Sequence, residues 1–203
     1  MSTRVMGIAG ALVLLFAWAG PLPGLVPQSF AAHMWLHMLV VGAAVPLIAA
    51  WLAPRLAITS ALALPIVVSL LDFVVVWGWH APALHHASRS LPLVLVAEQA
   101  SFFAVSLLVW LVALSGRDRG NAAMGGAMAL FFTSMHMTLL GALLGLSPRP
   151  LYEGHHGGGD GWLGLSPLAD QQLGGVVMLA IGGVVYLAGG LVLMARVLRR
   201  APA

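Results

Sequence analysis

Two histidines and two methionines repeat at a helical spacing near the start of the chain. The segment AAHMWLHMLV, residues 31–40, holds His33 and His37 four residues apart, with Met34 and Met38 at the same spacing. On a helix this spacing stacks the imidazoles on one face and the thioethers on the adjacent face. Imidazole and thioether together suit Cu(I). The segment is equally compatible with interfacial histidines and methionines that only pack, so its chemistry depends on what other helices bring to it.

Two other apolar segments carry residues of the same kinds. The segment FFTSMHMTLLG contains Met135, His136 and Met137, a second cluster of histidine and methionine. The segment LDFVVVWGWHAP contains Asp72 and His80, which are eight residues apart and therefore on nearly the same helix face. Three helices can thus contribute ligands to one site.

Several ionisable residues lie deep in apolar segments. If these segments are membrane-spanning helices, the helical rise counted from their outer ends gives the depth of each residue in the membrane. His136 lies roughly 15 Å deep, Asp72 roughly 12 Å below His80, and Glu98 roughly 10 Å below Leu91. Intramembrane acids and histidines are expensive and normally face a bundle interior or a polar cavity. Asp72 in particular needs a counter-charge, either a bound metal cation or a protonated histidine; a neutral, hydrogen-bonded acid is the alternative.

These residues predict a metal site in the outer half of the membrane, with copper as the preferred ion. His37, His80 and His136 are the expected first ligands, the carboxylates would orient imidazoles or tune the charge, and the methionines would serve as entry or exchange ligands. Imidazole with carboxylate also suits Zn(II), Fe or Cu(II), and histidines on facing helices can clamp a haem instead. The full predicted set is His33, His37, His80, His136, Asp72, Glu98, Met34, Met38, Met135 and Met137.

Polar residues in the outer connections can extend this site. His85 and His86 follow His80 in what reads as a loop, and Asp170 and Gln171 either belong to the site or cap the last helix at its N-terminus. The segment YEGHHGGGDG, residues 152–161, also contains histidines, but its glycines predict a mobile tether.

The composition defines the class of protein that positions these residues. Hydrophobic residues make up 61% of the 203 residues and charged residues only 7%, which is too little polar surface for a water-soluble globule. The nine basic residues are all arginines and are scattered, so the chain offers no basic face to nucleic acid. The absence of cysteine excludes disulfides and thiolate ligands, so any soft metal ligand must be methionine. The sequence predicts an integral membrane protein.

Six apolar segments predict an all-α, polytopic bundle of about six transmembrane helices. Most reach the roughly 20 residues that the hydrocarbon core requires, whereas the first is marginal and also resembles a secretory signal that ends in AWA. We expect residues 1–203 to form a single membrane domain with an outer loop at 147–172. We also expect the glycines spaced by seven in the last helix to pack against neighbouring helices. The predicted segments are 5–19, 33–53, 57–79, 91–114, 122–146 and 173–196.

Arginine placement orients this bundle. In a six-span arrangement seven arginines fall on one side and two, Arg89 and Arg149, on the other. The positive-inside rule then places both termini in the cytoplasm if the first helix is retained, and the loops at 20–32, 80–90 and 147–172 outside. The expected location is a bacterial cytoplasmic (inner) membrane.

Four segments together resemble the CtaG-type cytochrome c oxidase assembly factors, the caa(3)-type oxidase assembly family: HMWLHM, WGWHAPALHHA, SPRPLY and LSPLADQQLGGVVM. The resemblance extends from about His33 to the end of the last helix. It implies an integral membrane assembly factor for a haem–copper oxidase that acts in copper delivery or insertion. It points to His33, His37, His80, His136 and the pair Asp170 and Gln171 as motif positions. The chain departs from the family pattern in two ways: Gln99 follows Glu98 where a histidine is usual, and members often have more spans.

The expected function is therefore that of a non-enzymatic assembly factor that holds copper and delivers it to a cytochrome oxidase subunit, with a periplasmic copper donor as a second partner and membrane lipid around it. A haem-binding membrane redox protein is the alternative. A metal-ion or proton transporter is less favoured, because polar residues are nearly absent from the inner halves of the predicted helices.

Overall fold

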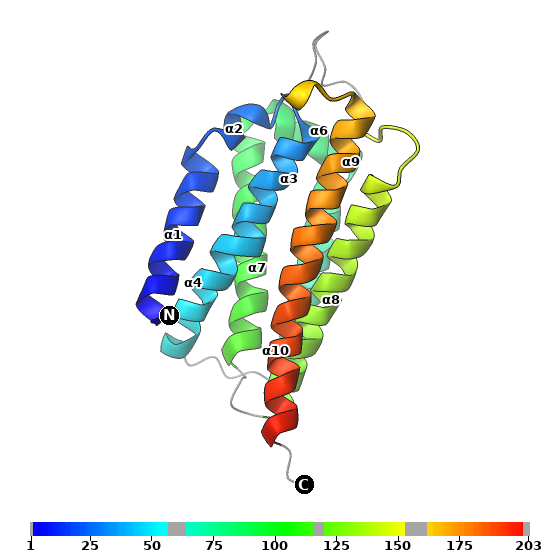
Figure 1. Ribbon diagram of the computed structural model, residues 1–203. Coiled ribbons are helices and arrows are strands. Elements are labelled where there is room, and N and C mark those ends of the chain that lie inside the picture. The colour runs from blue at the N-terminus through cyan, green and yellow to red at the C-terminus, as the bar shows by residue number, and fades with distance from the viewer. Residues whose placement is uncertain (1, 57–63, 116–119, 153–161, 201–203) are drawn as a thin grey trace.

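The computed structural model describes residues 2–56, 64–115, 120–152 and 162–200. In these ranges the chain forms a bundle of long helices joined by short connections (Figure 1). The main elements are α1 (Thr3–Ala19), α2 (Leu22–Leu25), α3 (Phe30–Met38), η1 (Leu39–Ala44), α4 (Val45–Leu52), η2 (Ala53–Arg55), α5 (Leu64–Trp79), α6 (Pro82–Ser90), α7 (Pro92–Ser115), α8 (Gly120–Gly145), η3 (Trp162–Gly164), α9 (Pro167–Met178), η4 (Leu179–Gly183) and α10 (Val184–Arg200).

The bundle has the dimensions of a polytopic membrane protein. Five helical stretches in the described residues are long and apolar enough to cross a membrane, and α5 with α6, bent by 71°, passes the same test as a pair. The predicted all-α bundle of about six spans is confirmed. The marginal first segment is part of a 23-residue apolar stretch, Thr3–Leu25.

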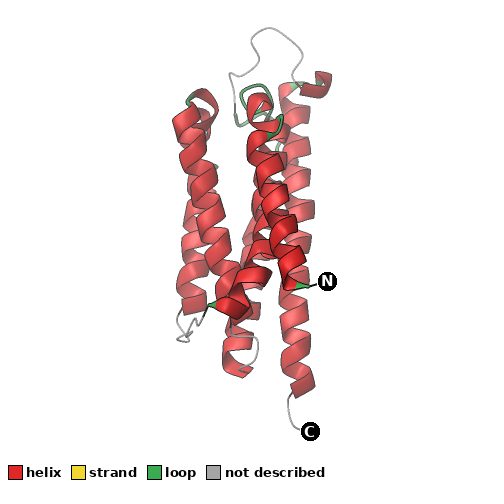
Figure 2. Ribbon diagram, turned by 90° about the vertical axis from the view of Figure 1, so that its left-hand side faces the viewer, coloured by secondary structure: helices red, strands yellow, loops and turns green. Residues whose placement is uncertain are grey.

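The start of α1 and the end of α10 lie at one end of the bundle, and α2 and α6 lie at the other (Figure 1). The end that contains α2 and α6 is called the outer end below, following the arginine pattern. A view turned by 90° shows the long helices running along one common direction (Figure 2).

Two connections differ from the sequence prediction. Residues 80–90, expected as a loop, contain the helix α6, which begins at Pro82 and buries His85, Ser88 and Arg89. Proline at the first position of a helix removes no hydrogen bond, so Pro82 begins α6 instead of breaking it. The predicted outer loop 147–172 is shorter than expected, because α9 begins at Pro167 with Ser166 as its N-cap. The tether at residues 153–161 lies outside the described residues.

Two spans contain a π-helical turn at mid-length. The segment η1 joins α3 to α4, and η4 joins α9 to α10. A π-turn inserts a residue into the helical repeat and occurs most often near functional sites. The hydroxyl of Tyr186, which follows η4, donates to the carbonyl oxygen of Val41 in η1 at 3.4 Å. The two irregular turns therefore lie side by side in the core.

Glycines allow α8 and α9 to approach each other closely. A Cβ atom added to Gly141 on α8 would lie 2.7 Å from the backbone nitrogen of Leu179. Gly175 on α9 faces the backbone of Gly141 and Gly145, where a Cβ would also clash. The predicted packing role of the glycines in the last span is confirmed, since added Cβ atoms at Gly182 and Gly189 also meet neighbouring side chains.

Candidate metal centre

Three buried side chains from three helices converge at the outer end. His33 on α3, His85 on α6 and Glu98 on α7 each place one ligand atom within 4.8 Å of the other two. Nε2 of His33 lies 3.0 Å from Oε2 of Glu98. This contact lies outside hydrogen-bond geometry, and among the described residues neither ring nitrogen of His33 has a hydrogen-bond partner. The three side chains form the outer cluster.

The outer cluster depends on how α3 begins. Ser29 is the N-cap of α3, and its hydroxyl accepts from the backbone nitrogen of Ala32 at 3.1 Å. Asp170, which reaches across from α9, accepts from the Ser29 hydroxyl at 2.6 Å and from the backbone nitrogens of Phe30 and Ala31 at 2.6 and 3.2 Å. A carboxylate is favoured here because the unpaired N–H groups and the helix dipole are positive at a helix N-terminus.

His37 and His80 form a second pair of histidines, the inner pair, one turn of α3 below His33. Their ring centroids are 5.9 Å apart. Nδ1 of His80 lies 2.7 Å from the carbonyl oxygen of Val76, an acceptor, so Nδ1 carries the proton and Nε2 has the free lone pair. Among the described residues, Nε2 of His80 and both ring nitrogens of His37 lack a hydrogen-bond partner. Phe102 packs against His37 at a centroid distance of 4.0 Å.

His85 connects the outer cluster to the inner pair. Its ring centroid is 5.0 Å from that of His33 and 6.5 Å from that of His80. The four imidazoles thus follow one another from His33 through His85 and His80 to His37. Tyr152 covers this row at the outer end, with its ring 4.2 Å from that of His85 and its hydroxyl donating to the His80 carbonyl oxygen at 2.9 Å.

A buried arginine lies near the outer cluster. Arg89 on α6 donates to the carbonyl oxygen of Pro27 at 3.3 Å and interacts electrostatically with Asp170 and Glu98. With both carboxylates counted as ionised, the three groups sum to one negative charge around the cluster. The sequence predicts Arg89 only as a charge in an outer loop, because its segment reads as a loop and not as the helix α6.

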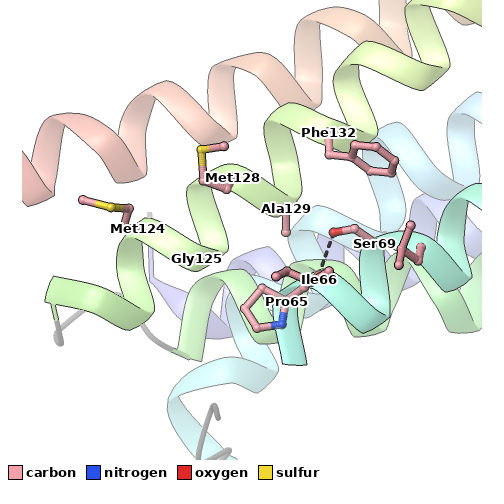
Figure 3. Close-up of a pocket in the computed structure, with 9 residues that line it drawn as sticks. Pro65, Ile66, Ser69, Met124, Gly125, Met128, Ala129 and Phe132 are labelled. Carbon is pink, nitrogen blue, oxygen red and sulfur yellow. Dashed lines mark hydrogen bonds between the residues drawn. The ribbon is translucent and has the colours of Figure 1, made fainter. Parts of the chain in front are cut away.

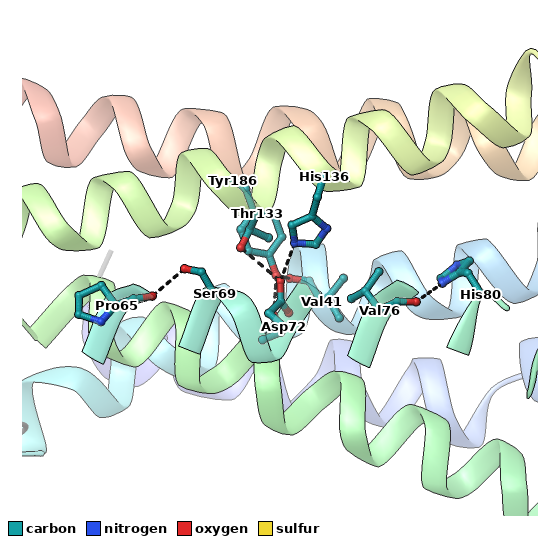
Figure 4. Close-up of polar contacts among 10 residues, drawn as sticks. Val41, Pro65, Ser69, Asp72, Val76, His80, Thr133, His136 and Tyr186 are labelled. Atoms are coloured by element: carbon teal, nitrogen blue, oxygen red, sulfur yellow. Dashed lines mark hydrogen bonds and ion pairs between the residues drawn. The ribbon is translucent and has the colours of Figure 1, made fainter. Parts of the chain in front are cut away.

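Asp72 and His136 form a separate pair at greater depth, shown in Figure 4. Oδ2 of Asp72 lies 3.1 Å from Nε2 of His136 and accepts from the Thr133 hydroxyl at 3.2 Å. The hydroxyl of Tyr186 lies beside this pair and shares a hydrogen bond of 2.6 Å with Ser106. The depths of Asp72 and His136 were predicted, but the structure does not bring His136 to the histidines of α3.

The predicted methionine ligands lie on other faces of their helices. Met34 lies beside Gly174, and Met38 and Met137 lie beside Gly182, so all three pack towards the last span and away from the histidines. Met135 is 60% exposed on the outside of the bundle. The structure therefore brings imidazoles and a carboxylate together, without thioethers.

Of the outer residues in the prediction, only His85 joins the cluster. His86 is on the exposed face of α6. Gln171 accepts from the backbone nitrogen of Leu151 at 2.6 Å and donates to the carbonyl oxygen of Leu144 at 3.3 Å, so it fixes the end of α8 to α9. Asp170 bonds the start of α3, and the N-cap of its own helix is Ser166, so of the two alternatives left open by the sequence the cap of the last span is wrong.

Tyr152 and Phe30 also lie beside the outer cluster, and the sequence analysis did not predict either of them as a site residue. The two rings stack at a centroid distance of 4.9 Å, and Phe30 also contacts His85 at 5.1 Å. Phe30 directly precedes the histidine segment and Tyr152 ends the SPRPLY motif, so the available signal was their closeness to motif residues.

Two apolar grooves open on the lipid-facing surface. The larger, about 460 Å³, lies between α5 and α8 and is lined by residues such as Pro65, Met128 and Phe132 (Figure 3). The smaller, about 260 Å³, lies between α1, α3 and α7. Gln99 lines it and donates to Oε2 of Glu98 at 3.4 Å, which links this groove to the outer cluster. None of the histidines that the structure describes lines either groove.

Comparison with known proteins agrees with the motif resemblance. The chain matches the family described as cytochrome c oxidase caa3 assembly factor (Caa3_CtaG) over residues 3–200. No curated protein and no solved structure matches it. Because the match extends over nearly the whole chain, this protein belongs to the Caa3_CtaG family of cytochrome c oxidase caa3 assembly factors.

Proposed function

We propose that this assembly factor is not an enzyme and that it holds one Cu(I) ion between His33, His85 and Glu98 for delivery to a subunit of a haem–copper oxidase. The observation that carries the proposal is the convergence of three buried ligand atoms within 4.8 Å of one another. A metal ion about 2.0–2.2 Å from each ligand separates those ligands by at most about 4.4 Å, so a shift of a few tenths of an ångström closes the site.

Two imidazoles and a carboxylate also suit Zn(II), Fe or Cu(II), so the choice of Cu(I) rests on the local charge, which favours a monovalent ion. Imidazoles are neutral when they bind a metal, so the charges that count are those of Glu98, Asp170 and Arg89. Their sum is one negative charge, which one Cu(I) neutralises and which Zn(II) would turn into a net positive charge. Uncompensated charge is costly in a membrane interior, so a neutral loaded site is favoured.

The packing of the histidines argues against haem. A haem clamped between two histidines requires an open slot for the porphyrin on both sides of the iron. Here the ring of His33 lies against that of His85, and His85 lies against Tyr152. These contacts fill the space that a porphyrin would occupy.

The outer end is the expected place of exchange with partners. His85 lies on α6, at the same end as Tyr152, and Gln99 connects Glu98 to a surface groove. We expect a periplasmic copper donor to approach this end and an oxidase subunit to receive the ion within the membrane.

Metal analysis of purified protein tests the proposal. Protein loaded with Cu(I) under reducing conditions should retain about one ion per chain and show no haem absorption. Glu98→Gln preserves the shape of the side chain but removes its charge, and should weaken Cu(I) binding at least about 100-fold, since loss of a ligand exceeds the 10–100-fold effect of outer-shell changes. His86→Ala, on the exposed face of α6, is the matched control. Wild-type protein that retains no copper, or equal losses in both variants, would refute the assignment.

A further inference from the structure

We infer that the inner pair, His37 and His80, is a second binding position for the same ion, two-coordinate and selective for Cu(I). This inference rests on the proposed function, because it concerns the ion bound by the outer cluster. The inner pair would receive the ion when ligands of the outer cluster release it.

Both rings of the inner pair have nitrogen atoms that are available to bind a ligand. His37 is fully buried and His80 is 6% exposed, yet three of their four ring nitrogens lack hydrogen-bond partners within the described residues. A buried polar atom left without a partner destabilises a fold by about 1–3 kcal/mol. A cation between the rings would use one lone pair from each. The Val76 carbonyl holds Nδ1 of His80, so Nε2 is the atom offered.

The separation of the rings fits one bridging ion. An imidazole nitrogen lies about 2.0 Å from a bound metal and about 1.2 Å from its own ring centre, so a linear arrangement separates the two ring centres by about 6.4 Å. The observed separation is 5.9 Å, shorter than the linear value, so one ion between the rings would have a bent arrangement. Two neutral nitrogen ligands beside Phe102 suit Cu(I), whereas Zn(II) takes four ligands in a tetrahedral site.

The row of imidazoles gives the ion a route between the two positions. His85 lies next to both His33 and His80, so ligands can be exchanged one at a time. Because the surroundings supply a single net negative charge, the two positions share one ion. The expected capacity is therefore one Cu(I) per chain.

A variant with a disrupted outer cluster isolates the inner pair. Glu98→Gln combined with His33→Ala should still bind Cu(I), at least tenfold more weakly than wild type, with the X-ray absorption signature of two nitrogen ligands, and should not retain Zn(II). Adding His37→Leu should abolish the remaining binding. Adding Met38→Leu instead, one residue away on the face towards η4, should leave it unchanged. If the double variant is not helical and monodisperse in detergent, His85→Ala alone provides the disrupted outer cluster.

The outcomes separate this inference from the proposed function. If wild type binds Cu(I) and the folded outer-cluster variant binds none, the inner position is refuted while the outer site stands. Residual Cu(I) that survives His37→Leu also refutes it. If wild type itself binds no Cu(I), the proposed function is refuted, and the inference about the inner pair is refuted with it. A capacity of two ions in wild type would refute the shared-ion mechanism.

Discussion

Oδ2 of Asp72 on α5 lies 3.1 Å from Nε2 of His136 on α8, and both side chains are buried in the core of the bundle. A carboxylate near the centre of a span costs about 2.5–3.5 kcal/mol, so it requires compensation. The sequence predicts a metal cation or a protonated histidine as the counter-charge, with a neutral, hydrogen-bonded acid as the alternative. In the structure the partners of Asp72 are His136 and the Thr133 hydroxyl. Both of these partners come from α8, and neither belongs to the outer cluster.

We expect Asp72→Ala to destabilise the protein by about 3–5 kcal/mol, because it leaves His136 without a partner. Copper content per folded chain should not change, since the pair lies apart from the outer cluster. Thermal unfolding in detergent and metal analysis measure the two effects, and Asp72→Asn, which retains an oxygen acceptor, should be milder. Copper loss without loss of stability would instead make Asp72 a metal-site residue.

The hydrogen bonds of Asp170 to the start of α3 predict an effect on both the stability of the fold and the affinity for copper. Asp170→Ala removes three hydrogen bonds and should lower the free energy of unfolding by about 3 kcal/mol. The first turn of α3 carries His33, so fraying should also weaken Cu(I) binding. Ser166→Ala, which removes the N-cap of α9 itself, is the control and should cost about 1 kcal/mol with no change in copper affinity.

Tyr152 provides a prediction of pH dependence. Burial raises the pKa of its phenol above the ordinary value of 10.0, so the folded state favours the neutral form. The contribution of Tyr152 to the free energy of unfolding is therefore present below about pH 10 and is lost as the pH rises further, because the unfolded state releases the phenol proton more readily than the folded state. Tyr152→Phe should cost about 1 kcal/mol near neutrality and lose less stability than wild type above about pH 10. An identical alkaline decline in both proteins would contradict this assignment.

The arginine pattern predicts the orientation of the bundle. Reporter fusions in the connection between α7 and α8 and after α10 should report the cytoplasm, and a fusion between Gly145 and Pro167 should report the exterior. A fusion between α7 and α8 that reports the exterior would invert the orientation and place the outer cluster on the cytoplasmic side.

The spans could be predicted because they follow from the hydropathy and length of the apolar segments. The direction of a side chain around its helix axis could not. Met135 and Met137 are two residues apart, yet the first is 60% exposed and the second fully buried. His136 is likewise predicted to join the histidines of α3, but it faces Asp72. Which face is buried depends on the neighbouring helices, and a single span that is apolar all round carries no signal for it.

His85 shows a second limit of the sequence. Its segment is polar, contains Pro82 and reads as a loop, so His85 and His86 looked equivalent. The 71° bend between α5 and α6 turns one of them into the core and leaves the other exposed. The helix α6 packs against α7, and Arg89 on α6 donates to the carbonyl oxygen of Pro27, a contact between residues 62 apart in sequence.

The bond between Asp170 and the start of α3 has a consequence for biogenesis. Ser29 and Asp170 are 141 residues apart, so α3 enters the membrane during translation well before its cap is synthesised. Until α9 inserts, the first turn of α3 lacks the carboxylate that fixes His33. The ribosome therefore synthesises nearly the whole chain before Asp170 is available to bind the start of α3, so this end of the bundle reaches its final hydrogen bonding only when the last span is in place.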